Sequence, residues 1–462
     1  MNTTKILTAG LFVAVSLSAN AQNYTIVDTE QSKFFDDKEV IAAPAKGEPF
    51  YGQDAHHMGN AASYTDNGDG TITDNVTGLM WQKGFDVMSY PEAMKVIEEF
   101  KLAGHNDWRI PTIKEAYSLI LFSGSDVNPQ LNAGSDSPGS PFINTNFFEF
   151  EYGANGNRPI DSQLLTSSLY VGSTEQNNLL FGVNFADGRI KGYGLKFGNG
   201  DKPFMVRFVR GEQYGINDFG DNGDGTITDN ATKLVWSKED SQRAMNWGEA
   251  LAYAEQMNAQ GYLGHSDWRV PNAKELQSIV DYSRSPLSSA SAAIDPIFAV
   301  SEIVDEAGEK DFPFYWSSTT HENSGTTAGS AGIYVAFGRS LGNMSNMQMM
   351  PTPQGEGGNG PQMGNRPPQE AGQGRPEGGR PEGGRPEGGR PEGDRPEGGR
   401  PEGQGNHQQP SQNAEPNWVD VHGAGSQRSD PKSGDPSIYA DGHGPQGDVV
   451  RTYNYVRLVR DL

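Results

Sequence analysis

The chain has 462 residues, no cysteine, and a formal net charge of −23 from 59 acidic and 36 basic side chains. The lack of cysteine excludes disulfides, thiolate metal ligands and thiol nucleophiles. A surface this acidic repels nucleic acid, anionic membranes and sulfated polysaccharides, and the arginines are scattered rather than clustered. We therefore expect no nucleic-acid partner.

The first 21 residues have the pattern of a secretory signal peptide. Lys5 precedes an apolar run at residues 6–17, and residues 19–21 read Ala-Asn-Ala, an A-x-A cleavage site. The run is too short to span a bilayer, and no later segment approaches the length of a transmembrane helix. We expect an exported protein without an integral membrane segment, located in the periplasm, at the cell surface or outside the cell. Residues 22–49 would form an N-terminal extension.

The rest of the chain repeats itself once. The segment "DNGDGTITDNVTGLMWQK", which begins at Asp66, returns from Asp221 as "DNGDGTITDNATKLVWSK". A helical apolar pattern follows in both copies, then "GHNDWRIPTIKE" or "GHSDWRVPNAKE", and finally an alternating strand, "FMVRFVR" or "YNYVRLVR". The repeat predicts two homologous domains, at residues 50–211 and 212–462. The order of hairpin, helix, helix and strands predicts an α+β fold class.

The repeated decapeptide "DNGDGTITDN" has two interpretations. Aligned as an EF-hand loop, the first copy has Thr65 and Val76 at ligand positions 1 and 12, where carboxylates are needed, and the second copy fails at the same positions. Asn-Gly and Asp-Gly pairs instead favour a β-hairpin turn, because these residues tolerate positive φ. The hairpin is the favoured interpretation. In the alternative, calcium would bind at Asp66, Asp69, Asp74, Asp221, Asp224 and Asp229.

The motif that follows predicts the start of the second helix in each copy. Thr112 suits the N-cap and Glu115 completes a capping box, and Asn272 with Glu275 repeats the arrangement. We expect the tryptophan of each Asp-Trp-Arg triplet to join the core. The arginine of each triplet is expected to pair with a buried carboxylate or with carbonyls.

The second copy carries an insertion at residues 343–416. It is rich in Met, Pro, Gly and Gln and contains six "RPEG" units, which start between Arg375 and Arg400. Their period of five residues is not the Gly-X-Y period of collagen. Each unit lacks an apolar side chain and cannot bury a core, so we expect a disordered loop.

A long polar loop, residues 418–451, is the candidate ligand site. It has aromatic and aliphatic side chains that could anchor it, and ordered long loops are often functional. The alternative is a packed surface loop without a ligand. The candidate ligand-binding or cation-binding side chains are His422, Asp430, Asp435, Asp441, His443 and Asp448.

The ordered set of "DNGDGT", "TGLMW", "DWRIPT", "YWSST" and "YVRLVR" resembles the Lcl C-terminal domain family, named for a bacterial collagen-like adhesin. The first copy departs from it with "SLYVGST" in place of "YWSST". The "WRIPT" helix start is also similar to that of formylglycine-generating enzymes. These resemblances imply two C-type-lectin-like domains, each a twisted antiparallel sheet flanked by two helices. They place the insertion and the 418–451 loop in the region where that fold binds ligands.

The sequence is compatible with three functions. We favour a non-catalytic, adhesin-like binding protein that recognises a glycan or an envelope or surface partner. The net charge argues against the sulfated polysaccharide that the family's namesake binds. The second function is a structural envelope protein stabilised by calcium, the one cofactor considered. The third is an enzyme of the formylglycine-generating type, which would need cysteines to hold copper. The sequence indicates no catalytic residue and no oligomeric state.

Overall fold

The computed structural model describes residues 23–127, 139–154, 158–172, 178–323, 327–345, 416–440, 442–444 and 446–462. The predicted signal peptide and the RPEG units lie outside the described residues. All of the described residues belong to one compact unit. Among them, no helix is both long and apolar enough to cross a membrane.

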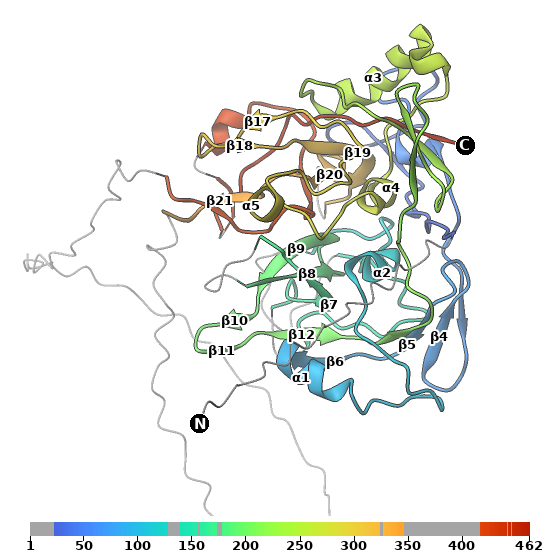
Figure 1. The fold of residues 1–462 in the computed structure, drawn as a ribbon, viewed down its shortest axis with the longest axis vertical. Helices are drawn as coiled ribbons and strands as arrows, with labels where there is room; N and C mark the ends of the chain where they lie inside the picture. Colours follow the sequence, from blue (N-terminus) through green and yellow to red (C-terminus); the bar gives the residue numbers. More distant parts are fainter. Residues whose placement is uncertain are drawn as a thin grey trace, which may run out of the picture. The chain divides into compact units, whose positions relative to one another are not determined.

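Each copy begins with a small four-stranded sheet, in which the decapeptide forms a hairpin (Figure 1). In the first copy the strand order is β13-β5-β4-β3, and in the second it is β14-β15-β16-β24. The strands are β3 (Tyr64–Asp66), β4 (Thr71–Asp74), β5 (Met80–Gln82), β13 (Val209–Arg210), β14 (Phe219–Asp221), β15 (Thr226–Asp229), β16 (Leu234–Ser237) and β24 (Val459–Asp461).

The predicted hairpin turn is confirmed in both copies. In the first copy, Gly68 and Gly70 take the positive φ angles of 75° and 88° that the turn requires. The Asn67 side-chain amide donates to the hydroxyl of Thr71, 2.9 Å away, which ties the turn to β4. Asn222 makes the equivalent bond in the second copy, also at 2.9 Å.

The helices start where the motifs predict. Thr112 and Asn272 are N-caps with complete capping boxes. The Arg109 guanidinium binds the Glu115 carboxylate at 2.6 Å, and its counterpart Arg269 is buried against the carboxylate of the second capping box. The predicted pairing of both arginines is thus confirmed. The helices are α1 (Tyr90–Val96), α2 (Ile113–Ser118), α3 (Trp247–Gln260), α4 (Ala273–Ser278) and α5 (Pro286–Ser289).

The sheet-rich α+β class is confirmed, but the copies do not have separate large sheets. One eight-stranded sheet runs through both, in the order β19-β20-β23-β9-β8-β7-β12-β6 (Figure 1). The copies join where β23 pairs with β9 through Gln427 and Ile190. The pair β12–β7 is parallel, so the sheet is mixed. Its strands are β6 (Asp86–Ser89), β7 (Gln163–Leu169), β8 (Leu179–Asn184), β9 (Arg189–Gly194), β12 (Pro203–Val206), β19 (Phe314–His321), β20 (Ala331–Ala336) and β23 (Gln427–Pro431).

Short elements complete the described chain. The predicted insertion starts inside one of them, because Asn343 ends β21, which pairs with β22. The Asn343 side-chain oxygen accepts from the N–H of Asn417, so hydrogen bonds join the two sides of the insertion. The elements are β1 (Phe34–Phe35), β2 (Val40–Ile41), β10 (Lys196–Phe197), β11 (Gly200–Asp201), β17 (Ile303–Val304), β18 (Lys310–Asp311), β21 (Leu341–Asn343), β22 (Trp418–Asp420), η1 (Asp54–His56), η3 (Tyr262–Gly264) and η5 (Pro436–Tyr439).

Two lysines link the copies reciprocally at the facing helices α2 and α4. Lys114 of α2 donates to the carbonyl of Ser278 at 2.7 Å, and Lys274 of α4 donates to the carbonyl of Ser118 at 3.0 Å. Burial lowers the pKa of Lys114 to about 8 and that of Lys274 to about 7. The two halves therefore meet in a packed, nearly two-fold contact that fixes one copy against the other.

An N-terminal arm, residues 28–57, packs against the second copy, and its Thr29 carbonyl also accepts from the N–H of Phe122 in the first copy at 2.7 Å. The Gln31 side chain donates to the Thr320 carbonyl at 2.6 Å and accepts from the Thr320 N–H at 2.8 Å. The Asp54 carboxylate accepts from the hydroxyls of Thr29 at 2.8 Å and Thr319 at 2.6 Å. The sequence analysis did not predict this contact, which joins residues far apart in the chain.

The buried Asp54 generates a testable pH dependence. Burial, with smaller contributions from the charges of Asp28 and Glu275, raises the pKa of its carboxyl from 3.8 to about 7. The two hydrogen bonds from hydroxyl groups act in the opposite direction, and the charged group Lys274 also lies nearby. Between these values the folded chain binds more protons than the unfolded chain, so the free energy of unfolding falls as pH rises from about 4 to about 7. We expect the free energy of unfolding to fall less for Asp54→Asn than for the wild type over this pH range. The difference should be roughly 1.4 kcal/mol for each unit by which folding raises the pKa.

Urea denaturation followed by far-UV circular dichroism at pH 4 to 8 measures this difference. Glu98→Gln, at an exposed position, is the control and should keep the wild-type pH profile. Parallel profiles for Asp54→Asn and the wild type would contradict the expectation.

Candidate functional site

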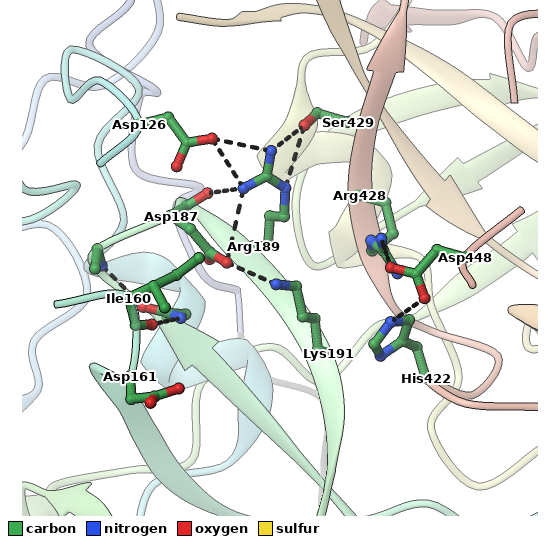
Figure 2. A network of polar contacts seen from close by, with 12 residues as sticks. Asp126, Ile160, Asp161, Asp187, Arg189, Lys191, His422, Arg428, Ser429 and Asp448 are labelled. Carbon is green, nitrogen blue, oxygen red and sulfur yellow. Dashed lines mark hydrogen bonds and ion pairs between the residues drawn. The ribbon is translucent and has the colours of Figure 1, made fainter. Parts of the chain in front are cut away.

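The predicted 418–451 loop is not one continuous loop, because it contains β22, η5 and β23, a strand inside the large sheet. Two of its six candidate residues come together. The Nε2 atom of His422 lies 3.1 Å from Oδ1 of Asp448, whose other oxygen binds Nη2 of Arg428 at 2.6 Å (Figure 2). Burial, together with the smaller effect of the adjacent Arg428 charge, lowers the pKa of His422 to about 4. Burial alone would raise the pKa of Asp448, but the charge of Arg428 and the bond from His422 hold it well below its usual range. The group is a neutral histidine beside a buried ion pair.

The side chains of the other predicted residues that the structure describes do not join this pair, although the backbone of His443 pairs with that of Asp448 through two hydrogen bonds of 2.8 and 2.7 Å. Asp430 is buried, and its Oδ2 accepts from the Tyr334 hydroxyl at 2.8 Å. Asp435 is exposed and caps η5 through the N–H of Ser437. The His443 ring packs against Tyr439, with 5.9 Å between ring centroids. Asp441 lies outside the described residues.

A larger polar network surrounds the seam between β9 and β23 (Figure 2). Nη2 of Arg189 binds the Ser429 hydroxyl at 2.8 Å, and Nη1 binds Oδ2 of Asp126 at 3.2 Å. Lys191 binds the buried Asp187 carboxylate at 2.6 Å. Both Arg189 and Lys191 therefore contact a carboxylate, because a buried charge without a counter-charge is unfavourable. This network serves to hold the copies together.

The turn aspartates accept hydrogen bonds from their own hairpins. Asp66 accepts from the N–H of Gly68 and pairs with Lys83, while Asp69 accepts twice from Thr71. Asp74 accepts from two backbone N–H groups of the following turn. Within the described residues there is no group of three or more His, Cys, Asp or Glu side chains that could hold a metal ion. The second copy repeats these roles at Asp221, Asp224 and Asp229.

The structure also contains a cleft that the sequence analysis missed. It lies between the two copies and the segment that links them, and it encloses about 320 Å³, within the range of small-ligand sites. Its walls combine a hydroxyl, an ammonium, an amide, two carboxylates and an aromatic ring. We call it the inter-copy cleft; the side chains that define it are Lys114, Ser168, Gln213, Asp281, Tyr282 and Asp295.

Most of the cleft side chains are held by bonds to the protein. Lys114 donates to three oxygens, those of Gly215, Asn217 and Ser278. The Tyr282 hydroxyl donates to a backbone carbonyl of the 418–451 loop at 3.0 Å. Gln213, by contrast, is exposed. Ser168 begins "SLYVGST", but the structure places it opposite Thr319, the last residue of "YWSST", because each hydroxyl accepts from the first N–H of the second helix. The expectation that "SLYVGST" stands in place of "YWSST" is therefore wrong, and no motif of the sequence points to this cleft.

The buried ion pair predicts a specific loss of stability. In Asp448→Asn the Arg428 charge would remain buried without its counter-charge, which typically costs about 3–5 kcal/mol. We expect that loss in the free energy of unfolding from urea titrations. Asp435→Asn, on the same loop but exposed, is the matched control and should change it by about 0.5 kcal/mol or less. Equal effects of the two substitutions would contradict a structural role for Asp448.

The turn aspartates predict how the protein responds to calcium. Because their oxygens already accept from N–H and hydroxyl groups and from lysines, calcium would have to displace those bonds. We expect the same melting temperature by scanning calorimetry in millimolar calcium and in excess chelator. A rise that depends on calcium concentration would show binding to the folded state and contradict this expectation.

Comparison with known proteins identifies the family. The sequence profile of the Lcl C-terminal domain matches residues 70–210 and, a second time, residues 225–351. These matches cover more than half of the chain and correspond to the two halves that share the large sheet. No curated protein and no solved structure matches the chain. With its small sheet, capped helices and large-sheet strands present twice, the chain belongs to the Lcl C-terminal domain family.

Proposed function

We propose that this chain is an exported, non-catalytic, adhesin-like protein that binds a partner of the cell envelope or surface in the inter-copy cleft. The observation that carries the proposal is the construction of the cleft from both copies and the segment between them. A ligand there would contact Ser168 of the first copy, Gln213 of the linking segment and Asp281 of the second. Export rests on the signal-peptide pattern of the sequence.

The walls of the cleft are preorganised for binding. The reciprocal lysine bonds hold α2 and α4 together, and the copies share one sheet. A site whose side chains are already fixed loses little conformational entropy when a ligand binds. We further propose that each copy has a C-type-lectin-like fold, supported by the antiparallel strands and the capped helices that both copies have.

The polar groups of the cleft suit recognition better than catalysis. The Ser168 hydroxyl accepts from the N–H of Ile113 at 3.0 Å, whereas a nucleophilic serine would donate to a general base. The Lys114 ammonium is already bound by three oxygens. Asp281 and Asp295 make the cleft unsuitable for a polyanion, as does the net charge of −23. A neutral glycan or a protein segment fits this electrostatic environment.

A bulky side chain at the mouth of the cleft tests the proposal. Gln213→Trp places an indole at an exposed cleft position without disturbing the core, and the neighbouring exposed Glu212→Trp is the matched control. Labelled mature protein would be applied to a glycan array and to isolated bacterial envelopes. We expect Gln213→Trp to lower binding at least tenfold and Glu212→Trp to leave it unchanged. Wild-type protein that binds neither target, or binding that is insensitive to Gln213→Trp, would contradict the proposal.

A further inference from the structure

The two copies place a hydroxyl at the same point beside their second helices. Ser168 at the end of β7 accepts from the N–H of Ile113 at 3.0 Å, and Thr319 at the end of β19 accepts from the N–H of Ala273 at 2.9 Å. Each strand has a register irregularity at this point, between Leu165 and Leu169 in β7 and between Trp316 and Thr320 in β19. Ser168 and Thr319 are therefore structural equivalents, and their surroundings can be compared directly.

In the second copy the N-terminal arm fills this position. Thr319 donates its hydroxyl proton to Oδ2 of Asp54 at 2.6 Å. The next residue, Thr320, has both its N–H and its carbonyl bound by the Gln31 amide. Thr319 and Thr320 are both 0% exposed. Two separate parts of the arm, η1 and the stretch before β1, thus supply a carboxyl group to the hydroxyl and an amide to the adjacent backbone.

In the first copy the equivalent edge is open. Ser168 is half-buried in the wall of the inter-copy cleft, and none of the described residues accepts its hydroxyl proton. Leu169, the counterpart of the fully buried Thr320, is 44% exposed, and Val171 is 40% exposed. The segment that links the copies runs only from the end of β13 to the start of β14. It is far shorter than the arm, which explains why it leaves this edge uncovered.

We infer that this edge, formed by Ser168, Leu169 and Val171, binds an extended polypeptide segment of the protein partner. That segment places a carboxyl or amide side chain on the Ser168 hydroxyl, as the arm places Asp54 on Thr319, and packs apolar side chains on Leu169 and Val171. The inference rests on the proposed function and specifies the class of its ligand. A polypeptide is favoured over a glycan because a polypeptide covers the equivalent edge and because adjacent exposed aliphatic side chains suit protein contacts.

A labelled synthetic peptide with the arm sequence, residues 28–57, is the probe. We expect it to bind the full mature chain in fluorescence anisotropy. Ser168→Ala should weaken binding of the peptide at least tenfold. Ser168→Thr, which introduces the residue found at the equivalent position of the second copy, should retain the wild-type affinity. Leu169→Asp should weaken binding to a similar degree, whereas Phe197→Asp, on the exposed β10–β11 hairpin, should have no effect. A peptide with Asp54→Ala should bind the wild-type protein and Ser168→Ala with equal affinity. A peptide with Asp54→Asn should still bind the wild-type protein more tightly than Ser168→Ala.

Hydrogen exchange locates the peptide. Protection of residues 163–171 supports the inference, while protection confined to residues 314–321 would mean that the peptide only replaces the chain's own arm, and would overturn it. Equal affinity of Ser168→Ala and wild type, with both folded by circular dichroism, would also overturn it, as would a failure of the peptide to bind. If an oligosaccharide binds instead and Gln213→Trp blocks it, this inference fails and the proposed function stands. If Gln213→Trp changes no binding at all, both fail.

Discussion

Pairing of β9 with β23 is the constraint on which the rest of the structure depends. Each strand would otherwise be the edge of its own half-sheet, with backbone N–H and C=O groups unpaired. Their pairing creates one sheet and brings charged side chains of both halves together, so that Arg189 reaches Ser429 across the seam. It also holds α2 against α4, which lets Lys114 and Lys274 cross to the opposite copy. The inter-copy cleft exists because these contacts fix the halves at one distance.

The near two-fold arrangement is broken by the N-terminal arm. The arm precedes the first copy in sequence but packs on the second, where it buries Thr319 and Thr320. The residues at the two edges differ accordingly: the Thr320 hydroxyl accepts from the buried Lys432, whereas Leu169 keeps an aliphatic side chain in solvent. Duplication thus gave two similar edges, one now closed within the chain and one open beside a cleft.

Local features could be predicted from the sequence because their partners lie within a few residues. The hairpin turns need Asn-Gly and Asp-Gly, and the capping boxes need a carboxylate three residues after Thr112 or Asn272. The seam and the arm contacts join residues more than 200 positions apart, such as Arg189 with Ser429, and no local pattern specifies them. For the candidate site, loop composition found the contact between His422 and Asp448. It could not show that Asp430 turns to Tyr334, or that Ser168 and Asp281 line one cleft.

The buried Asp54 indicates what the open edge would select. Its carboxyl has two hydroxyl donors and forms no ion pair with any residue that the structure describes. Burial raises its pKa to about 7, so that a substantial fraction is uncharged near neutral pH. Ser168 offers the same kind of hydroxyl, and the ammonium of Lys114, which lines the same cleft, is already bound by three oxygens. Asp281 and Asp295 further disfavour a negative ligand atom in the cleft. An amide or a protonated carboxyl is therefore a better partner for this hydroxyl than an ionised one, and selectivity comes from hydrogen-bond geometry rather than from charge.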